Sequence, residues 1–256
     1  MRRNLFFASF VIAVATFAGS HAFALGIGAY MDAFGGESDR VVYSNALERT
    51  GGKSTNYGFK AGLLFDTCAA CDQVFNYRLK IGGSLSKGDL VAKTSFNGFH
   101  MSHTFGFAAV TNDAARFWIG PQIGFSYLRG SSNRWALNAE YPGATYALAA
   151  QSGIVPSPSY FGLFQIGIFK ERTKYSSYRG DAGLAFGVNL NLGDYVSLGL
   201  EAGVTYGYAF GRQDREVYYA GGPILPYNRF KDRSREQGVE GYGSVSFMFR
   251  FLDTFQ

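Results

Sequence analysis

Residues 195–210, YVSLGLEAGVTYGYAF, alternate between two kinds of side chain. The even positions from Val196 to Phe210 are all apolar or aromatic, whereas the odd positions from Tyr195 to Ala209 are mostly small or polar. A period of two that is kept over sixteen residues indicates a β-strand whose two faces meet different surroundings. The stretch therefore predicts a long strand between an apolar and a polar environment.

The same alternation recurs in other segments. It is strong at 115–129, 181–192 and 239–251, and weaker at 25–34, 55–66, 74–86 and 95–110. The connections are short at 67–73, 111–114 and 193–194, intermediate at 87–94, and long and polar at 35–54, 130–176 and 211–236. Short turns on one side with long loops on the other are typical of outer-membrane barrels. We therefore predict an all-β fold, an eight-stranded antiparallel transmembrane β-barrel with long extracellular loops and short periplasmic turns.

The composition excludes most other classes. Only 17% of the 256 residues are charged, while 25 Phe and 17 Tyr offer ample apolar surface to bury, which excludes disorder. The 34 glycines and many aromatics disfavour a helical bundle, and two cysteines are too few for a disulfide scaffold. Beyond residue 24, no stretch reaches the ~18 consecutive apolar residues of a membrane helix.

Three structural questions stay open at this stage. A soluble, lipocalin-like barrel also alternates, but its exterior would carry about 25–35% charged residues, which the small, weakly charged face of this chain lacks. The segment Tyr160–Lys170 is strand-like; we interpret it as a hairpin arm above the membrane, and a ten-stranded barrel that uses part of 134–152 is the alternative. In 95–110, the alternation that turns Phe99 outward also turns the polar His103 outward, onto the apolar face. A β-bulge, which shifts the alternation by one residue, would turn His103 inward.

Residues 1–24 have the features of a secretory signal peptide. Arg2 and Arg3 precede the apolar run Leu5–Ala18, and Ala22-Phe23-Ala24 has the small-x-small pattern of a cleavage site. We therefore predict a signal peptide at 1–24 and an outer-membrane β-barrel at 25–256. Without Arg2 and Arg3, 22 of the 24 basic residues remain against 19 acidic ones, and a net charge of +3 gives no reason to expect a nucleic-acid partner.

In these features the chain resembles the small bacterial outer-membrane β-barrel proteins, the group of the OmpA transmembrane domain, OmpX and OmpW. The resemblance covers the mature chain and rests on pattern. Such barrels end in an aromatic residue that the assembly machinery recognises, and Phe247, Phe249 and Phe251 supply alternating aromatics here. The chain then continues to Gln256 with Phe255 in phase but not terminal. The resemblance implies a location in the bacterial outer membrane, with outer-membrane lipid as a partner.

Charged residues on the small, polar face are the first candidates for function. Counting from strand ends places Lys60, Lys80 and Glu201 near the midplane of the lumen, Asp32, Asp181 and Glu240 toward the outer mouth, and Arg78, Arg116 and Arg250 toward the periplasmic mouth. Because an unpaired charge inside a narrow barrel is costly, we expect these groups to pair, with Glu201 and Asp32 as partners for the two lysines. The network predicts a largely plugged lumen; a narrow polar path is the alternative.

Two further motifs suggest chemistry. His100-Met101-Ser102 resembles the His-x-Ser of outer-membrane lipid A deacylases and phospholipases, but His103 follows where those families have Asn, and no acidic partner is evident. Cys68 and Cys71 lie in a short turn, where a local disulfide is expected in an oxidising compartment. We expect no catalytic residues and no cofactor. We also expect no metal site, since His100 and His103 are the only mature histidines.

The long loops are the expected working surface, above all residues 211–236. This segment mixes charge with tyrosine, which suits contacts with an anionic glycolipid or with a host or extracellular protein. Its candidate residues are Arg212, Arg215, Tyr218, Tyr219, Tyr227, Arg229, Lys231, Arg233 and Arg235. We predict a non-enzymatic barrel that serves membrane architecture and surface interaction. The alternatives are a narrow channel for small or hydrophobic solutes, as in OmpW-like barrels, and a lipid-modifying hydrolase.

Overall fold

The computed structural model describes residues 25–43, 49–69, 73–88, 94–137, 168–219 and 228–251; the signal peptide predicted at 1–24 lies outside them. Eight strands follow one another along the chain: β1 (Leu25–Tyr43), β2 (Arg49–Asp66), β3 (Phe75–Gly88), β4 (Thr94–Thr111), β5 (Ala115–Leu137), β6 (Ile168–Asn191), β7 (Val196–Tyr219) and β8 (Asn228–Phe251). The described residues contain no helix long and apolar enough to cross a membrane.

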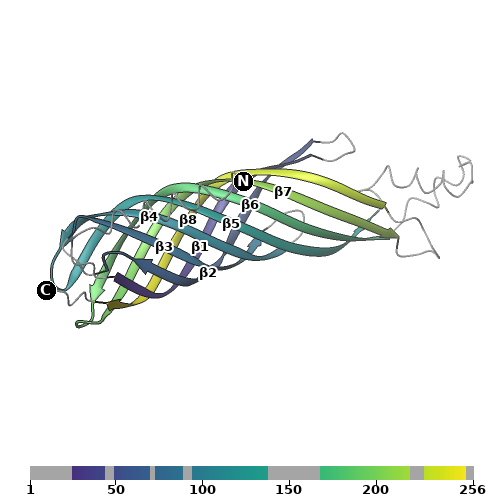
Figure 1. Cartoon of the computed structure of the whole chain (residues 1–256). Coiled ribbons are helices and arrows are strands. Elements are labelled where there is room, and N and C mark those ends of the chain that lie inside the picture. Colours follow the sequence, from purple (N-terminus) through teal and green to yellow (C-terminus); the bar gives the residue numbers. More distant parts are fainter. Residues whose placement is uncertain are drawn as a thin grey trace, which may run out of the picture.

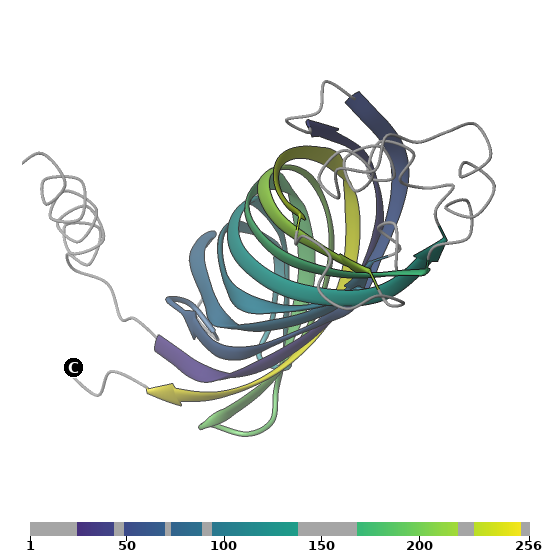
Figure 2. The ribbon, with the colours of Figure 1, turned by 90° about the vertical axis from the view of Figure 1, so that its right-hand side faces the viewer.

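Each strand pairs antiparallel with the next, and β8 pairs with β1, so the sheet closes on itself (Figures 1 and 2). The predicted eight-stranded barrel is confirmed. The ten-stranded alternative is wrong, because β5 pairs directly with β6 and the ring closes with eight strands. We call the end with the short turns β2–β3, β4–β5 and β6–β7 periplasmic, and the opposite end outer.

The strands are strongly tilted, which one row of paired residues makes visible. Starting at Ala33 in β1, direct partners follow one another through all eight strands: Phe59, Leu85, Asn97, Arg129, Ser176, Arg212 and Arg233. Arg233 then pairs with Tyr43, ten residues beyond Ala33 in β1. A row perpendicular to the strands therefore climbs toward the outer end as it runs from β2 to β8, as closure of a tilted barrel requires.

The two faces have the predicted orientation. Large apolar side chains such as Phe59, Leu184 and Phe186 are more than half exposed on the outer wall, whereas most residues buried inside are polar or charged. A soluble barrel would have the opposite arrangement, with its apolar residues inside. The outer wall therefore faces hydrocarbon, and the lipocalin-like alternative is wrong.

The strands are longer than the sequence pattern indicated, and the predicted loops are correspondingly shorter. β7 continues to Tyr219 and β8 starts at Asn228, so most of 211–236 is paired strand. The loop predicted at 35–54 is likewise reduced by β1 and β2, and that at 130–176 by β5 and β6. Alternating hydrophobicity fades where the outer face becomes charged, although the backbone pairing continues. In Tyr160–Lys170, the last three residues begin β6, and 160–167 lie outside the described residues.

The β-bulge considered for 95–110 does not lie at His103. Pairing is regular there, with Leu79 and Ile123 as its neighbours, and the register shifts instead between Ala108 and Val110. His103 stays on the outer wall, where its Nδ1 lies 2.5 Å from the hydroxyl of Tyr77. A polar pair thus satisfies the imidazole in the apolar wall.

Candidate functional site

The lumen holds a stack of polar clusters, which begins near the periplasmic end at Asp66. This carboxylate is fully buried and accepts hydrogen bonds from the backbone N–H of Cys68 at 2.9 Å and from the amide of Asn76 at 3.2 Å. The guanidinium of Arg78 lies 3.3 Å from Asp66 and is stacked 4.5 Å from the ring of Trp118. The lower lumen is therefore filled by an ion pair and an indole.

The middle cluster bridges the lumen from several strands. Lys80 of β3 lies 3.0 Å from Asp32 of β1 and 3.1 Å from Glu201 of β7. Glu201 also lies 3.5 Å from Arg78, and one of its oxygens is 2.7 Å from the hydroxyl of Tyr242. The same hydroxyl is 2.7 Å from the side-chain oxygen of Gln122 on β5, on another part of the wall. Side chains from five strands thus meet around Glu201.

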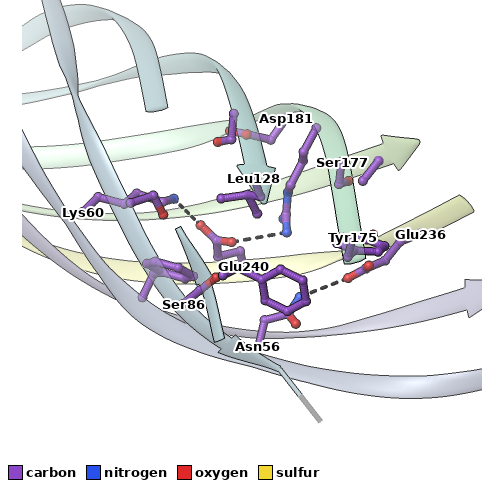
Figure 3. A pocket seen from close by; sticks show the side chains of 15 residues that line it. Asn56, Lys60, Ser86, Leu128, Tyr175, Ser177, Asp181, Glu236 and Glu240 are labelled. Atoms are coloured by element: carbon purple, nitrogen blue, oxygen red, sulfur yellow. Dashed lines mark hydrogen bonds and ion pairs between the residues drawn. The ribbon is translucent and has the colours of Figure 1, made fainter. Parts of the chain in front are cut away.

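A third cluster surrounds Glu240 of β8 (Figure 3). One carboxylate oxygen lies 2.5 Å from Lys60 Nζ, and the other lies 3.3 Å from Arg179. Above it, Glu236 accepts hydrogen bonds from Asn56 at 3.0 Å and from Ser38 at 2.6 Å. Both carboxylates are therefore held by donors from other strands.

The outermost lumen is also occupied. Arg40 donates to the side chain of Gln213 at 3.2 Å and lies 4.8 Å from the ring of Tyr175. Arg215 lies 3.5 Å from Asp232, whose side chain is almost fully buried. The polar filling thus extends from the periplasmic turns to strand segments beyond the apolar wall.

Glycines provide the space for these large side chains. A Cβ on Gly203 would lie 2.6 Å from the ring of Tyr242, and one on Gly207 would lie 2.5 Å from the guanidinium of Arg179. Real Cβ atoms do not approach other atoms so closely, so Tyr242 and Arg179 each lie over a residue that has no Cβ. The glycine-rich face is therefore one half of a complementary packing pattern.

One cavity lies among the described residues of the upper lumen, and it is small. This cavity of about 40 Å³ lies among Lys60, Asp181, Arg179, Tyr175 and Glu236 (Figure 3). One water needs roughly 10–15 Å³ of such volume, so the cavity has room for a few water molecules. It is much smaller than the ~300–1,000 Å³ of sites that bind organic ligands.

Two arginines hold the periplasmic turns. Arg116 donates to the backbone carbonyls of Cys68, Gln73 and Val74, the last two at 2.7 and 3.4 Å. Arg250 donates to the carbonyl of Gly193, which has a φ of 79° in the β6–β7 turn. Cys68 is buried, and the described residues include no free cysteine, but Cys71 lies outside them. The disulfide between the two stays a prediction.

The structure brings most of the proposed lumen charges together but changes one pairing. Asp32 and Glu201 were expected to serve the two lysines Lys60 and Lys80, but both contact Lys80, and Lys60 contacts Glu240 instead. Asp66 and Arg179 are lumen charges that were not predicted from the sequence. The alternation of faces along a strand indicates both, because Asp66 follows Lys60 by six residues and Arg179 precedes Asp181 by two, and even spacings keep a residue on the same face. Arg179 lies just before residues 181–192, where the alternation becomes recognisable, and so it was not assigned to the strand.

His100 and Ser102 do not form a nucleophile–base pair. His100 Nδ1 lies 3.0 Å from the hydroxyl of Ser126 on β5, and Ser102 Oγ is buried without a hydrogen-bond partner among the described residues. Within the same part of the chain, no group of three or more His, Cys, Asp or Glu side chains is arranged to hold a metal ion.

The residues proposed for the surface loop lie mostly in strands. Arg212, Arg215, Tyr218 and Tyr219 belong to β7; Arg229, Lys231, Arg233 and Arg235 belong to β8; Tyr227 lies outside the described residues. Arg215 points into the lumen toward Asp232, so its assignment to the outer surface is wrong. Arg212, Lys231, Arg233 and Arg235 are exposed on the outside of the barrel.

No protein-family model matches the chain, and no curated protein matches its sequence. Among solved structures, OprG from Pseudomonas aeruginosa is similar with a TM-score of 0.51 and 14% identity, covering 92% of this chain and 99% of that one. OmpT from Escherichia coli has a TM-score of 0.30 and 7% identity, covering 91% of this chain and 99% of that one. Neisserial surface protein A has a TM-score of 0.28 and 12% identity, covering 83% of this chain and 95% of that one. The likeness to OprG concerns the fold. The chain therefore folds as a small bacterial outer-membrane β-barrel.

Proposed function

We propose that the protein is a non-enzymatic, non-conducting barrel that contributes to outer-membrane architecture and acts through its outer rim and loops. The contact of Lys80 with both Asp32 and Glu201 carries this proposal, because these side chains cross the lumen from β3, β1 and β7. The clusters around Asp66 and Glu240 lie on either side of this crossing. An ion would have to displace these paired charges in order to pass, which is costly inside a narrow barrel.

Planar-bilayer recording tests the closed lumen. The refolded mature chain should give no discrete conductance steps, and Glu37→Ala, which removes an exposed charge from the outer wall, should behave in the same way. Steps in the wild-type protein whose size changes with Lys60→Ala or Glu201→Ala would establish the narrow channel instead.

The contacts of His100 support the non-enzymatic part of the proposal. Its Nδ1 contacts Ser126 inside the barrel, next to a cavity with room only for waters, whereas an acyl-chain substrate needs an open groove. Purified barrel should therefore not hydrolyse phospholipid or lipid A. Hydrolysis that is lost in Ser126→Ala or Ser102→Ala would contradict this and assign a lipid-modifying activity.

A further inference from the structure

The outer wall carries a groove that the lumen network does not explain. It has a volume of about 660 Å³ and lies across β2, β3, β4 and β5. Ala61 and Gly83 contribute small residues, Phe59, Leu85 and Tyr127 contribute large ones, and Asn97 and Arg129 contribute polar groups. This volume lies within the ~300–1,000 Å³ range of sites that hold organic ligands.

The tilt of the strands gives the groove a direction. Phe59, Leu85, Asn97 and Arg129 are consecutive members of the paired row that climbs toward the outer end. The row is apolar up to Leu85 and polar or cationic from Asn97 through Ser176, Arg212 and Arg233. The groove therefore begins in the apolar wall and ends at Arg129, where the wall changes from apolar to charged.

Basic residues predominate all around the outer part of the wall, and two of them lie at this end of the groove. Among the residues whose exposure is described, nine basic ones are exposed on the outer wall: Lys53, Lys87, Arg129, Arg172, Lys174, Arg212, Lys231, Arg233 and Arg235. Within the same set, the acidic residues on that wall are fewer: Glu37 and Asp39 are exposed, and Asp214 and Glu216 are half-buried. Lys87 follows Leu85 by two positions on the same face of β3, so it lies above the groove together with Arg129.

Tyr127 orients the guanidinium of Arg129. Arg129 Nε donates a hydrogen bond of 2.6 Å to the hydroxyl of Tyr127, whose ring is stacked 4.7 Å from that of Tyr178. Because a guanidinium has five N–H donors, this bond leaves it able to hold a phosphate in bidentate fashion. An aromatic belt at the membrane interface thus presents a fixed cation at the end of an apolar groove.

Gly83 keeps the groove empty without being needed by the backbone. A Cβ there would meet only the carbonyl oxygen of Gly98, at an ordinary 3.8 Å. Its neighbour Gly82 faces the lumen, where a Cβ would collide with the backbone of Ala61. The hollow at Gly83 is thus a property of the outer surface, and a larger residue could fill it without disturbing the fold.

We propose that this groove binds one acyl chain of the phosphorylated, multiply acylated glycolipid (lipid A) of the outer leaflet, and that Arg129, with Lys87, holds its phosphate. The excess of exposed basic residues on the outer part of the wall favours this anionic lipid. The site rests on the proposed function only in placing the barrel in the outer membrane; it does not depend on whether the lumen conducts.

Native mass spectrometry of the refolded barrel in detergent, titrated with bis-phosphorylated lipid A, tests the site. The wild-type protein should form a one-to-one complex. Gly83→Leu, which fills the groove, and Arg129→Gln, which removes the cation, should each weaken binding about tenfold. Ala61→Phe fills the groove from β2 and replaces Gly83→Leu if that variant fails to fold.

Matched variants on the other side of the barrel are the controls. A Cβ on Gly243 of β8 would meet nothing within 4 Å, and Arg235 is an exposed arginine 5.6 Å from a tyrosine ring. Gly243→Leu and Arg235→Gln should bind lipid A as tightly as the wild type. Dephosphorylated lipid A should bind at least about tenfold more weakly, with no further loss in Arg129→Gln, because dephosphorylation already removes the contact with Arg129.

Three results would overturn the site. One is unchanged binding by the groove-filling and Arg129→Gln variants. Another is an equal loss in Gly243→Leu, which would indicate a general surface effect. The third is equally tight binding of phosphatidylglycerol, which would show that any anionic lipid is held. None of these results changes the conductance recording, so the site and the closed lumen are tested separately.

Discussion

Glu201 is the residue on which the lumen network depends most. Its carboxylate lies within 3.1 Å of Lys80, 3.5 Å of Arg78 and 2.7 Å of the Tyr242 hydroxyl, so it joins the lower and middle clusters. Two cations near one buried carboxylate are tolerable only because Asp32 and Asp66 provide the remaining negative charge. The stability of the barrel should therefore respond to the loss of this single charge.

We expect Glu201→Ala to lower the free energy of unfolding by about 3 kcal/mol, because it leaves Lys80 and Arg78 buried with one carboxylate each. Urea unfolding of the barrel in lipid vesicles measures this. Glu201→Gln keeps the size of the side chain and an acceptor for Tyr242, so it should lower the free energy of unfolding less. Glu37→Ala, on the exposed wall, should change the free energy of unfolding by no more than about 0.5 kcal/mol. Equal stability of Glu201→Ala and wild type would mean that the cluster does not contribute.

Gly203 tests the complementary packing of the lumen. Its added Cβ would lie 2.6 Å from the Tyr242 ring, so Gly203→Ala must displace the ring and weaken its contacts with Glu201 and Gln122. The expected loss is about 1–3 kcal/mol of unfolding free energy. Gly243→Ala is the matched control, because its Cβ meets nothing within 4 Å. If both alanines behave alike in urea, glycine does not serve to accommodate the tyrosine.

At this scale the sequence predicts which residues face the lumen but not which of them meet. Lys60 is directly paired with Asp32 along the backbone, yet its ammonium contacts Glu240 on β8. Long side chains reach over their neighbours, and the tilt decides which residues lie at the same height. Neither property can be read from the alternation within one strand.

Among the elements, the turn between β2 and β3 depends on a side chain from a distant strand. Arg116 of β5 donates to three backbone carbonyls of this connection, those of Cys68, Gln73 and Val74. Position 116 was predicted to face the periplasmic mouth, but its partners are backbone groups of another connection. Sequence alone offers no signal for a contact of this kind.

Arg116→Ala should therefore loosen this turn. We expect faster hydrogen exchange in residues 67–69 and 73–74, and a loss of about 1.5–3 kcal/mol of unfolding free energy, since charged hydrogen bonds inside the barrel are removed. Exchange followed by mass spectrometry gives a local readout. Arg129→Ala, on the exposed wall of the same strand, should leave exchange in the turn unchanged; protection of the turn in Arg116→Ala would show that the arginine does not hold it.

The outer ends of the strands show where pattern-based prediction fails. The periplasmic ends were predicted to within two residues, because apolar alternation starts there and turn residues interrupt it. At the outer ends, β7 and β8 continue for many residues with Arg212, Arg233 and Arg235 on the outside. These segments are stabilised by backbone pairing in water, so they need no apolar face and show no hydrophobic period.

For the whole molecule, the solvent around the barrel determines which substitutions it tolerates. Leu184 of β6 is 60% exposed and is paired with Pro121 of β5 and Val204 of β7, so it lies within the apolar wall. Leu184→Arg places a charge in hydrocarbon and should cost about 2–4 kcal/mol of unfolding free energy in lipid vesicles. Gln237→Arg is the control, because Gln237 is exposed on the outer wall of β8, paired with Asp39 and two positions from Arg235, where water and head groups solvate a cation. Urea titration of both variants measures the difference. If Leu184→Arg costs no more than Gln237→Arg, the exposed leucines and phenylalanines do not face lipid, and the orientation on which the lumen network and the groove both depend would be wrong.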